Sequence, residues 1–149
     1  MKIAVACDHR GFKLKDFLAD ILKEKGHEVV DFGTHSSDSC DYPDYTYPAC
    51  VAVKSKKCER AILICYSGIG SAIVANKVRG VRAALVSNVK SAVLSRKHND
   101  SNVLVLPAYM LNKEQAKRIV FSWLKAEFEG GRHARRVNKI KEIEEKENV

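Results

Sequence analysis

Short apolar runs alternate with amphipathic stretches along most of the chain. In the amphipathic stretches the apolar residues recur three and four positions apart, the spacing of a half-buried helix. The pattern predicts helices over residues 14–22, 49–56, 69–78, 89–97 and 116–124. The continuous apolar runs predict strands over residues 3–6, 28–32, 61–65, 83–86 and 103–106. This alternation predicts an α/β fold, a three-layer α/β/α sandwich with a five-stranded parallel sheet.

A further helical segment follows a double glycine, after the predicted sheet is complete. It carries Val137, Ile140 and Ile143 three residues apart on an otherwise charged surface. Such a narrow apolar seam packs on its own domain or on a second copy of the chain, and its place after the last strand favours a second copy. We therefore expect a Rossmann-like domain over residues 1–131 and a C-terminal helix of that domain over residues 132–149.

Composition indicates a single ordinary globular domain. The chain has 149 residues, of which 46% are hydrophobic and 30% charged, so it can bury a core without disulfides or metals. Its first apolar run ends after about five residues, too short for a signal peptide or a membrane span. The five cysteines are an odd number without a CxxC pair, which favours reduced thiols over a disulfide framework or a zinc site. We expect a cytoplasmic protein with no membrane partner.

The formal net charge of +8 fits two kinds of anionic partner, nucleic acid or a small anionic substrate. Three arginines, Arg132, Arg135 and Arg136, lie close together in the last segment. Aromatic residues are not interleaved with the basic ones, as a base-stacking surface requires. The distribution therefore favours a small anionic substrate and no nucleic acid.

Ligands of open parallel sheets bind beyond the carboxyl ends of the strands. Residues 7–11 follow the first predicted strand and residues 65–71 follow the third. We expect residues 97–100, at the end of a helix, to lie beside them. The glycine-containing turn after Cys65 directs successive backbone N–H groups at one point, which suits a phosphate or a developing oxyanion.

Nucleotide and phosphatase motifs are missing from these turns. The sequence has no G-x-G-x-x-G fingerprint after a strand and no P-loop. A cysteine phosphatase needs an arginine six positions after its nucleophile. Ser71 and Lys13 stand at that spacing from Cys65 and Cys7.

The remaining candidates also have simpler explanations. Cys65 is a core residue or a reactive thiol, and the N–H-rich turn beside it favours a thiolate and the second role. His98 is a site residue or an exposed side chain at a helix end. Asp8 and His9 are site residues or a helix cap followed by an exposed histidine.

Five motifs in order resemble ribose-5-phosphate isomerase type B, the family that also holds galactose-6-phosphate and allose-6-phosphate isomerases. The resemblance extends over residues 1–143. The motifs are DHRGFKLK, DYPDY, CYSGIGSAIVANKVRGVRAAL, SRKHNDSNVLVLP and FEGGRHARRVNKI.

The resemblance implies an aldose–ketose isomerase of a phosphorylated sugar that uses neither a metal nor an organic cofactor. Cys65 matches the catalytic cysteine that moves a proton from carbon 2 to carbon 1 through a cis-enediolate. His98 matches the histidine that opens the furanose ring, and Asp8 the residue that holds ring hydroxyls. Ser67 stands where the family usually has threonine, whose hydroxyl relays protons between the two substrate oxygens.

Further substrate contacts are implied in the same way. Backbone N–H groups of the turn would stabilise the enediolate oxygens, and the residues concerned are Ser67, Gly68, Ile69, Gly70 and Ser71. Phosphate contacts match His9, Arg132, His133 and Arg136, and other substrate contacts match Asn99 and Tyr42. The family builds this site between two subunits, which implies a homodimer or a dimer of dimers.

Two tyrosines depart from the family pattern. Tyr66 replaces a glycine, and Tyr109 stands where an arginine that binds phosphate is common. Ribose 5-phosphate is the expected substrate. The alternatives are a six-carbon sugar phosphate (allose or galactose 6-phosphate) and a non-catalytic module that binds sugar phosphates.

Overall fold

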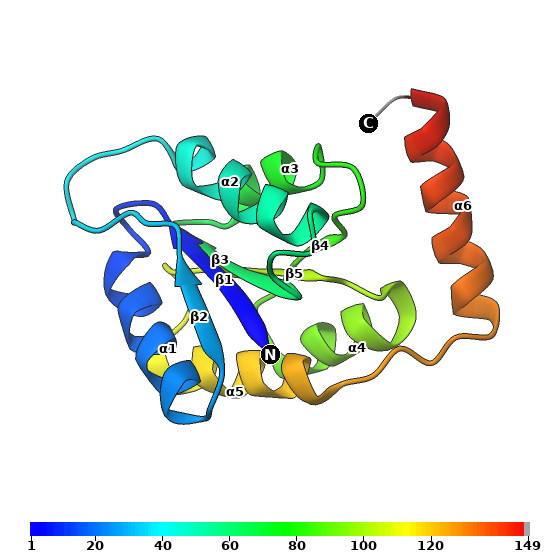
Figure 1. Cartoon of the computed structure of the whole chain (residues 1–149). Coiled ribbons are helices and arrows are strands. Elements are labelled where there is room, and N and C mark those ends of the chain that lie inside the picture. Colours follow the sequence, from blue (N-terminus) through cyan, green and yellow to red (C-terminus); the bar gives the residue numbers. More distant parts are fainter. Residues whose placement is uncertain (148–149) are drawn as a thin grey trace.

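The computed structural model describes residues 1–147 and confirms the predicted sandwich (Figure 1). Its strands are β1 (Lys2–Cys7), β2 (Glu28–Asp31), β3 (Arg60–Cys65), β4 (Ala83–Leu85) and β5 (Val103–Pro107). All pairs are parallel, in the order β2-β1-β3-β5-β4. The helices are α1 (Phe12–Glu24), α2 (Tyr42–Lys54), α3 (Ile69–Ala75), α4 (Val89–Asn99), α5 (Lys113–Lys125) and α6 (Arg132–Glu147).

Helices cover both faces of the sheet. Side chains of α1, α4 and α5 form one hydrophobic cluster with the sheet, and those of α2 and α3 form the other. Leu18 and Trp123 are fully buried in the first cluster and Cys50 in the second. Because β3 and β5 lie between both layers, their continuous apolar sequence is the pattern of a strand buried on both faces.

Helix α2 begins at Tyr42, well before the start predicted at residue 49. Its buried stripe starts at Thr46 and continues through Ala49 to Val53, at helical spacing. In the sequence, polar Thr46 and the internal Pro48 interrupt the apolar pattern by which such a stripe is recognised. A proline in the first turn is compatible with the helix start, because the first N–H groups have no partner within a helix.

Helix α3 ends three residues before its predicted end, and α5 ends one residue after its predicted stretch. Helix α3 ends at Ala75, because the side chain of Asn76 bonds both the N–H and the carbonyl of Ala83 and turns the chain into β4. Helix α5 ends at Lys125, and the double glycine follows a connection rather than the helix itself. Arg60 caps this end by donating to the carbonyls of Trp123 and Leu124.

Helix α6 stands beside the sheet domain rather than within it (Figure 1). His133 and Val137 are its buried residues, whereas Ile140 and Ile143 are 39% and 59% exposed. The predicted seam is therefore half covered by its own chain. Residues 148–149 of the predicted tail segment lie outside the described residues. Across residues 1–147, no helix combines the length and apolarity needed to cross a membrane.

Candidate active site

The predicted site residues fall into two groups. One group lies at the carboxyl edge of the sheet, where the parallel strands end, and the other lies at the amino edge, where the strands begin. Cys65 ends β3 and pairs with Pro107 at the end of β5. His98 lies in the last turn of α4, five residues before β5 begins at Val103. Five residues of parallel strand span roughly 13 Å. The expectation that residues 97–100 lie at the carboxyl edge is therefore wrong, because α4 runs antiparallel to the strands and returns the chain to their amino ends.

At the carboxyl edge, the Cys65 thiol receives a backbone N–H. The Gly68 N–H donates to Cys65 Sγ at 3.1 Å, and Cys65 is 4% exposed. Gly68 has a φ of 76°, and a Cβ there would lie 2.4 Å from a methyl group of Leu85. The turn therefore needs glycine for its left-handed backbone and for the close approach of β4. An N–H directed at sulfur stabilises a thiolate.

Other buried thiols lie in different surroundings. Burial raises the pKa of the Cys7 thiol to about 12, although nearby Lys15 opposes the shift. Burial alone raises the pKa of the Cys50 thiol to about 12. Both therefore stay protonated and unreactive at neutral pH. Within residues 1–147, Cys65 is the cysteine whose sulfur accepts a backbone N–H.

Asp8 joins the loops that follow β1 and β3. Its Oδ1 accepts N–H groups of Arg10 at 3.0 Å and Gly11 at 2.9 Å. Its Oδ2 accepts the N–H of Tyr66 at 3.4 Å, and the residue is 7% exposed. Asp8 is therefore a turn-stabilising carboxylate next to Cys65, rather than the cap of α1, whose N-cap is Gly11.

Other predicted residues surround the same turn. The ring of Tyr42 packs so closely on Gly70 that a Cβ there would lie 2.4 Å from it. His9 Nδ1 accepts the N–H of Cys40 at 3.3 Å, which leaves Nε2 of the ring free to carry the proton. Ser67 Oγ accepts the N–H of Ile69 at 3.3 Å.

The hydroxyl of Ser71 is not part of this turn surface. Ser71 is 1% exposed and accepts a hydrogen bond from Thr46 at 3.1 Å, in the contact between α2 and α3. Its backbone N–H alone remains for the predicted oxyanion contact.

At the opposite edge, two histidines stack. The rings of His98 and His133 lie 4.1 Å apart between centroids and 9° from parallel. Glu129 Oε2 is 3.9 Å from Nε2 of His98 and 3.6 Å from Nε2 of His133. Burial, followed by the charges of His98 and Arg132, lowers the pKa of His133, so its ring is neutral at neutral pH. Arg132 and Arg136 lie one turn apart on the same first part of α6, both exposed.

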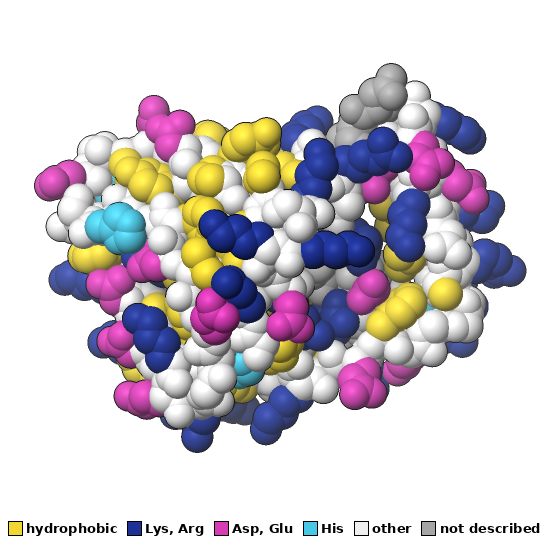
Figure 2. All heavy atoms as spheres, in the orientation of Figure 1, with side chains coloured by type: hydrophobic (Ala, Val, Ile, Leu, Met, Phe, Trp, Pro, Cys, Tyr) yellow, Lys and Arg dark blue, Asp and Glu magenta, His cyan; other side chains and the backbone are white. Residues whose placement is uncertain are grey.

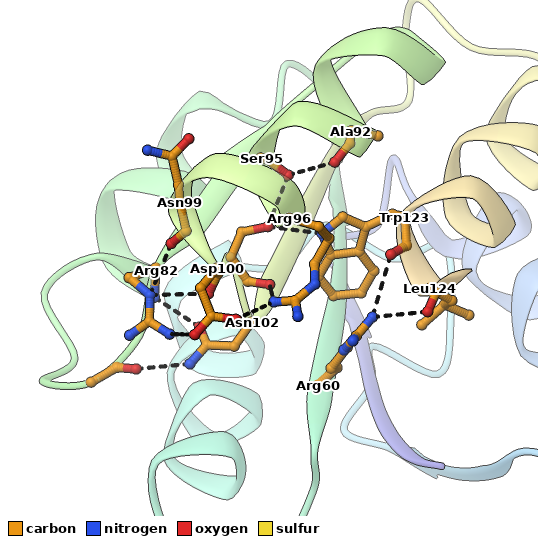
Figure 3. Close-up of polar contacts among 12 residues, drawn as sticks. Arg60, Arg82, Ala92, Ser95, Arg96, Asn99, Asp100, Asn102, Trp123 and Leu124 are labelled. Atoms are coloured by element: carbon orange, nitrogen blue, oxygen red, sulfur yellow. Dashed lines mark hydrogen bonds and ion pairs between the residues drawn. The ribbon is translucent and has the colours of Figure 1, made fainter. Parts of the chain in front are cut away.

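A polar network fixes the chain next to His98 (Figure 3). Arg82 donates to the carbonyls of Asn99 and Asp100 at 3.1 and 3.0 Å and pairs with the Asp100 carboxylate at 2.8 Å. Arg96 pairs with the other carboxylate oxygen at 2.8 Å. The side chain of Asn99 extends away from this network in Figure 3, so it is available for a ligand.

Comparisons with known proteins agree with the predicted resemblance. The ribose/galactose isomerase family model matches residues 3–140. The chain belongs to this family. A ribose-5-phosphate isomerase B of Escherichia coli (strain K12) is 48% identical over 147 residues, with 99% of each chain covered.

Solved structures of ribose-5-phosphate isomerase B have the same fold as this member of the ribose/galactose isomerase family. The Clostridium thermocellum structure has a TM-score of 0.97 at 53% identity and covers 98% of this chain and 99% of its own. The Mycoplasma genitalium structure, with bound ribulose-5-phosphate, has a TM-score of 0.93 at 42% identity and covers 97% and 96%. A ligand of the expected class is therefore present in a relative of nearly the same length and fold.

Glu129 is a residue of this isomerase family member that the sequence alone does not single out. The residue lies within the quoted FEGGRH motif, but only the fold places its carboxylate beside His98, His133 and Lys97. The indication in the sequence is that Glu129 and His133 are four residues apart, the spacing of neighbours on a helix. However, α6 begins only between these two residues.

Three potential metal ligands meet at the same place but do not form a metal site as arranged. Ligand atoms of His98, Glu129 and His133 lie within 4.8 Å of one another. A metal bound by imidazole lies close to the plane of the ring, about 2.0–2.1 Å from nitrogen. The two rings are stacked almost parallel, so no single point lies in both planes. The arrangement fits a pair of organic acid–base groups better than a metal.

Proposed function

We propose that this chain interconverts ribose 5-phosphate and ribulose 5-phosphate, as a homodimer whose active sites each combine the carboxyl-edge group of one copy with the amino-edge group of the other. The observation that carries the proposal is the Cys65 thiol, held by an N–H at the end of β3 in a member of this family. We also propose a cytoplasmic location, which the same chemistry supports. A free thiol with an acid–base role needs a reducing compartment, and all five cysteines are free.

Cys65 supplies the base on one side of the site. Its thiolate takes the proton from carbon 2 of the open-chain aldose, which gives a cis-enediolate. The same sulfur returns that proton to carbon 1, and the Ser67 hydroxyl moves a proton between the oxygens on carbons 1 and 2. N–H groups of Ser67, Gly70 and Ser71 stabilise the enediolate oxygens, whereas those of Gly68 and Ile69 bond Cys65 Sγ and Ser67 Oγ instead. One such donor contributes about 10²–10³-fold to a rate.

The other copy supplies the ring-opening and phosphate-binding groups. His98 moves a proton between the anomeric hydroxyl and the ring oxygen of the furanose. Arg132, Arg136 and neutral His133 bind the phosphate together with His9 of the first copy. Asn99 and Tyr42 contact the sugar from the two sides, and Asp8 keeps the loops beside Cys65 in place.

The surface around α6 supports the dimer. A hollow of about 510 Å³ separates α6 from the sheet domain, and it is lined by Ile140, Ile143 and Val81 together with Arg82. In Figure 2, both basic and acidic side chains lie around this hollow, and hydrophobic ones lie on the inner side of α6. In the proposed dimer, a second copy covers the exposed isoleucines and places its Cys65 turn against the His98 group.

A substrate panel tests the proposed activity. The purified protein is incubated with ribose 5-phosphate, allose 6-phosphate and galactose 6-phosphate, and ketose formation is followed. We expect ribose 5-phosphate to give the highest kcat/KM. Higher kcat/KM for a six-carbon substrate would support that alternative, and binding without any ketose would indicate a non-catalytic module.

Replacing His98 with asparagine should slow the reaction of cyclic ribose 5-phosphate by about 10²-fold or more, the usual contribution of an acid–base group. Ribulose 5-phosphate cannot form a furanose ring, so its initial conversion to enediolate should be much less impaired. Initial rates from the two substrates measure the difference. Equal losses from both substrates would contradict a ring-opening role for His98.

Replacing Arg132 and Arg136 together with alanine should raise KM for ribose 5-phosphate at least tenfold, because two charged phosphate contacts are lost. Deleting the chain after Gly131 should give a monomeric, inactive protein by light scattering and assay. The control is Lys141→Ala, which removes a cation from the opposite side of α6. Salt-dependent binding of duplex DNA, with KM unchanged in the double variant, would instead assign the basic tail to nucleic acid.

A further inference from the structure

An arginine and two tyrosines form a stack at the carboxyl edge. The rings of Tyr66 and Tyr109 lie 5.3 Å apart between centroids, inclined by 36°. The guanidinium of Arg10 lies over the Tyr66 ring, 5.7 Å from its centroid. Tyr66 and Tyr109 remain 54% and 57% exposed, so the stack forms a surface rather than part of the core.

The backbone holds this stack next to the reactive thiol. Arg10 N and Tyr66 N both donate to the carboxylate of Asp8, one to each oxygen. Tyr66 directly follows Cys65, and the Tyr109 N–H donates to the Tyr66 carbonyl at 3.1 Å. The loops after β1, β3 and β5 thus place one cation and two aromatic rings beside the Cys65 turn.

The guanidinium of Arg10 lacks an anionic partner in the part of the chain that the structure describes. Among residues 1–147 its side chain forms no ion pair and donates no hydrogen bond, although the main-chain N–H of Arg10 is bonded to Asp8. Stacking on Tyr66 restricts the side chain and leaves the N–H groups at the edge of the guanidinium free. Such a fork matches two oxygens of a phosphate.

We propose that Arg10 binds the phosphate of the substrate and that Tyr66, supported by Tyr109, holds its guanidinium in place. This inference rests on the proposed function, since it needs a phosphorylated substrate at the Cys65 turn. The phosphate then lies between Arg10 of one copy and the α6 arginines of the other. Arg10 is a binding residue, and the two tyrosines are positioning residues.

Steady-state kinetics and phosphate inhibition of Arg10→Ala test the proposal. We expect KM for ribose 5-phosphate and Ki for inorganic phosphate to rise together, by roughly tenfold or more, because a charged hydrogen-bonding group is lost. The value of kcat should change less than KM, because Arg10 does not move protons. Arg10→Lys should recover part of the loss, since lysine keeps the charge but not the fork. Tyr66→Ala should raise both constants by a smaller factor.

Lys57→Ala is the matched control, because Lys57 is another exposed cation over an aromatic ring, that of Phe32, in the turn that precedes β3. It removes the same charge and should leave both constants unchanged. Unchanged KM and Ki in Arg10→Ala would overturn the proposal. A rise in KM with Ki unchanged would also overturn it, because that result would place Arg10 against the sugar rather than the phosphate. Lack of turnover by the wild-type protein would instead refute the proposed function.

Discussion

Replacing Cys65 with alanine should stop isomerisation while the protein still binds sugar phosphate. The substitution removes the group that takes the proton from carbon 2, and a general base contributes about 10²–10⁴-fold to a rate. The arginines, His9 and the N–H groups of the turn are unchanged, so affinity persists. Ketose formation measures the loss, and calorimetric titration with ribose 5-phosphate measures the binding.

Cys58→Ala separates a catalytic role from a structural one. Cys58 is 1% exposed and lies in the turn before β3, at the edge opposite Cys65. Its replacement should lower the melting temperature slightly, because a small cavity forms, and should leave kcat unchanged. Near-normal turnover by Cys65→Ala would show that another residue is the base. A lower melting temperature of Cys65→Ala, with its kcat unchanged, would identify Cys65 as a core residue.

The strands could be predicted because local sequence determines them. A continuous apolar run such as residues 61–65 is stable only between two layers, so the run itself indicates a central strand. The start of α2 could not be predicted in this way. The stripe from Thr46 to Val53 depends on a buried threonine and on a proline tolerated inside the helix, and local propensity opposes both.

The sequence indicates which residues belong to the candidate site but not how the fold arranges them. Cys65 and its turn follow from the rule for carboxyl edges. The same rule does not extend to His98, because a helix after a parallel strand returns to the amino edge and carries its last residues there. Contacts that join distant segments could not be predicted at all. Glu129 beside His98, and Arg10 over Tyr66, depend on side-chain placement that only the folded chain provides.

Separation of the two groups within one chain makes a heterodimer experiment informative. Cys65→Ala and His98→Asn should each be nearly inactive with ribose 5-phosphate, since each damages every site of its homodimer. A heterodimer that contains one copy of each has one site with both defects and one site with neither. If each site draws Cys65 from one copy and His98 from the other, about half of the wild-type activity should return.

The reciprocal heterodimer pairs the double variant Cys65→Ala/His98→Asn with a wild-type copy. If the sites are shared between copies, every site in this pair lacks one group, so activity should be nearly absent. If each site lies within one copy, the wild-type copy should remain fully active. Both heterodimers are obtained by co-expression with two different affinity tags and are assayed with ribose 5-phosphate. The measurement that decides is the ratio of their kcat values. If each site combines residues of both copies, the heterodimer with the two substitutions in different copies should be active. The heterodimer with both substitutions in one copy should then have little activity. The opposite ratio would contradict a site shared between two copies.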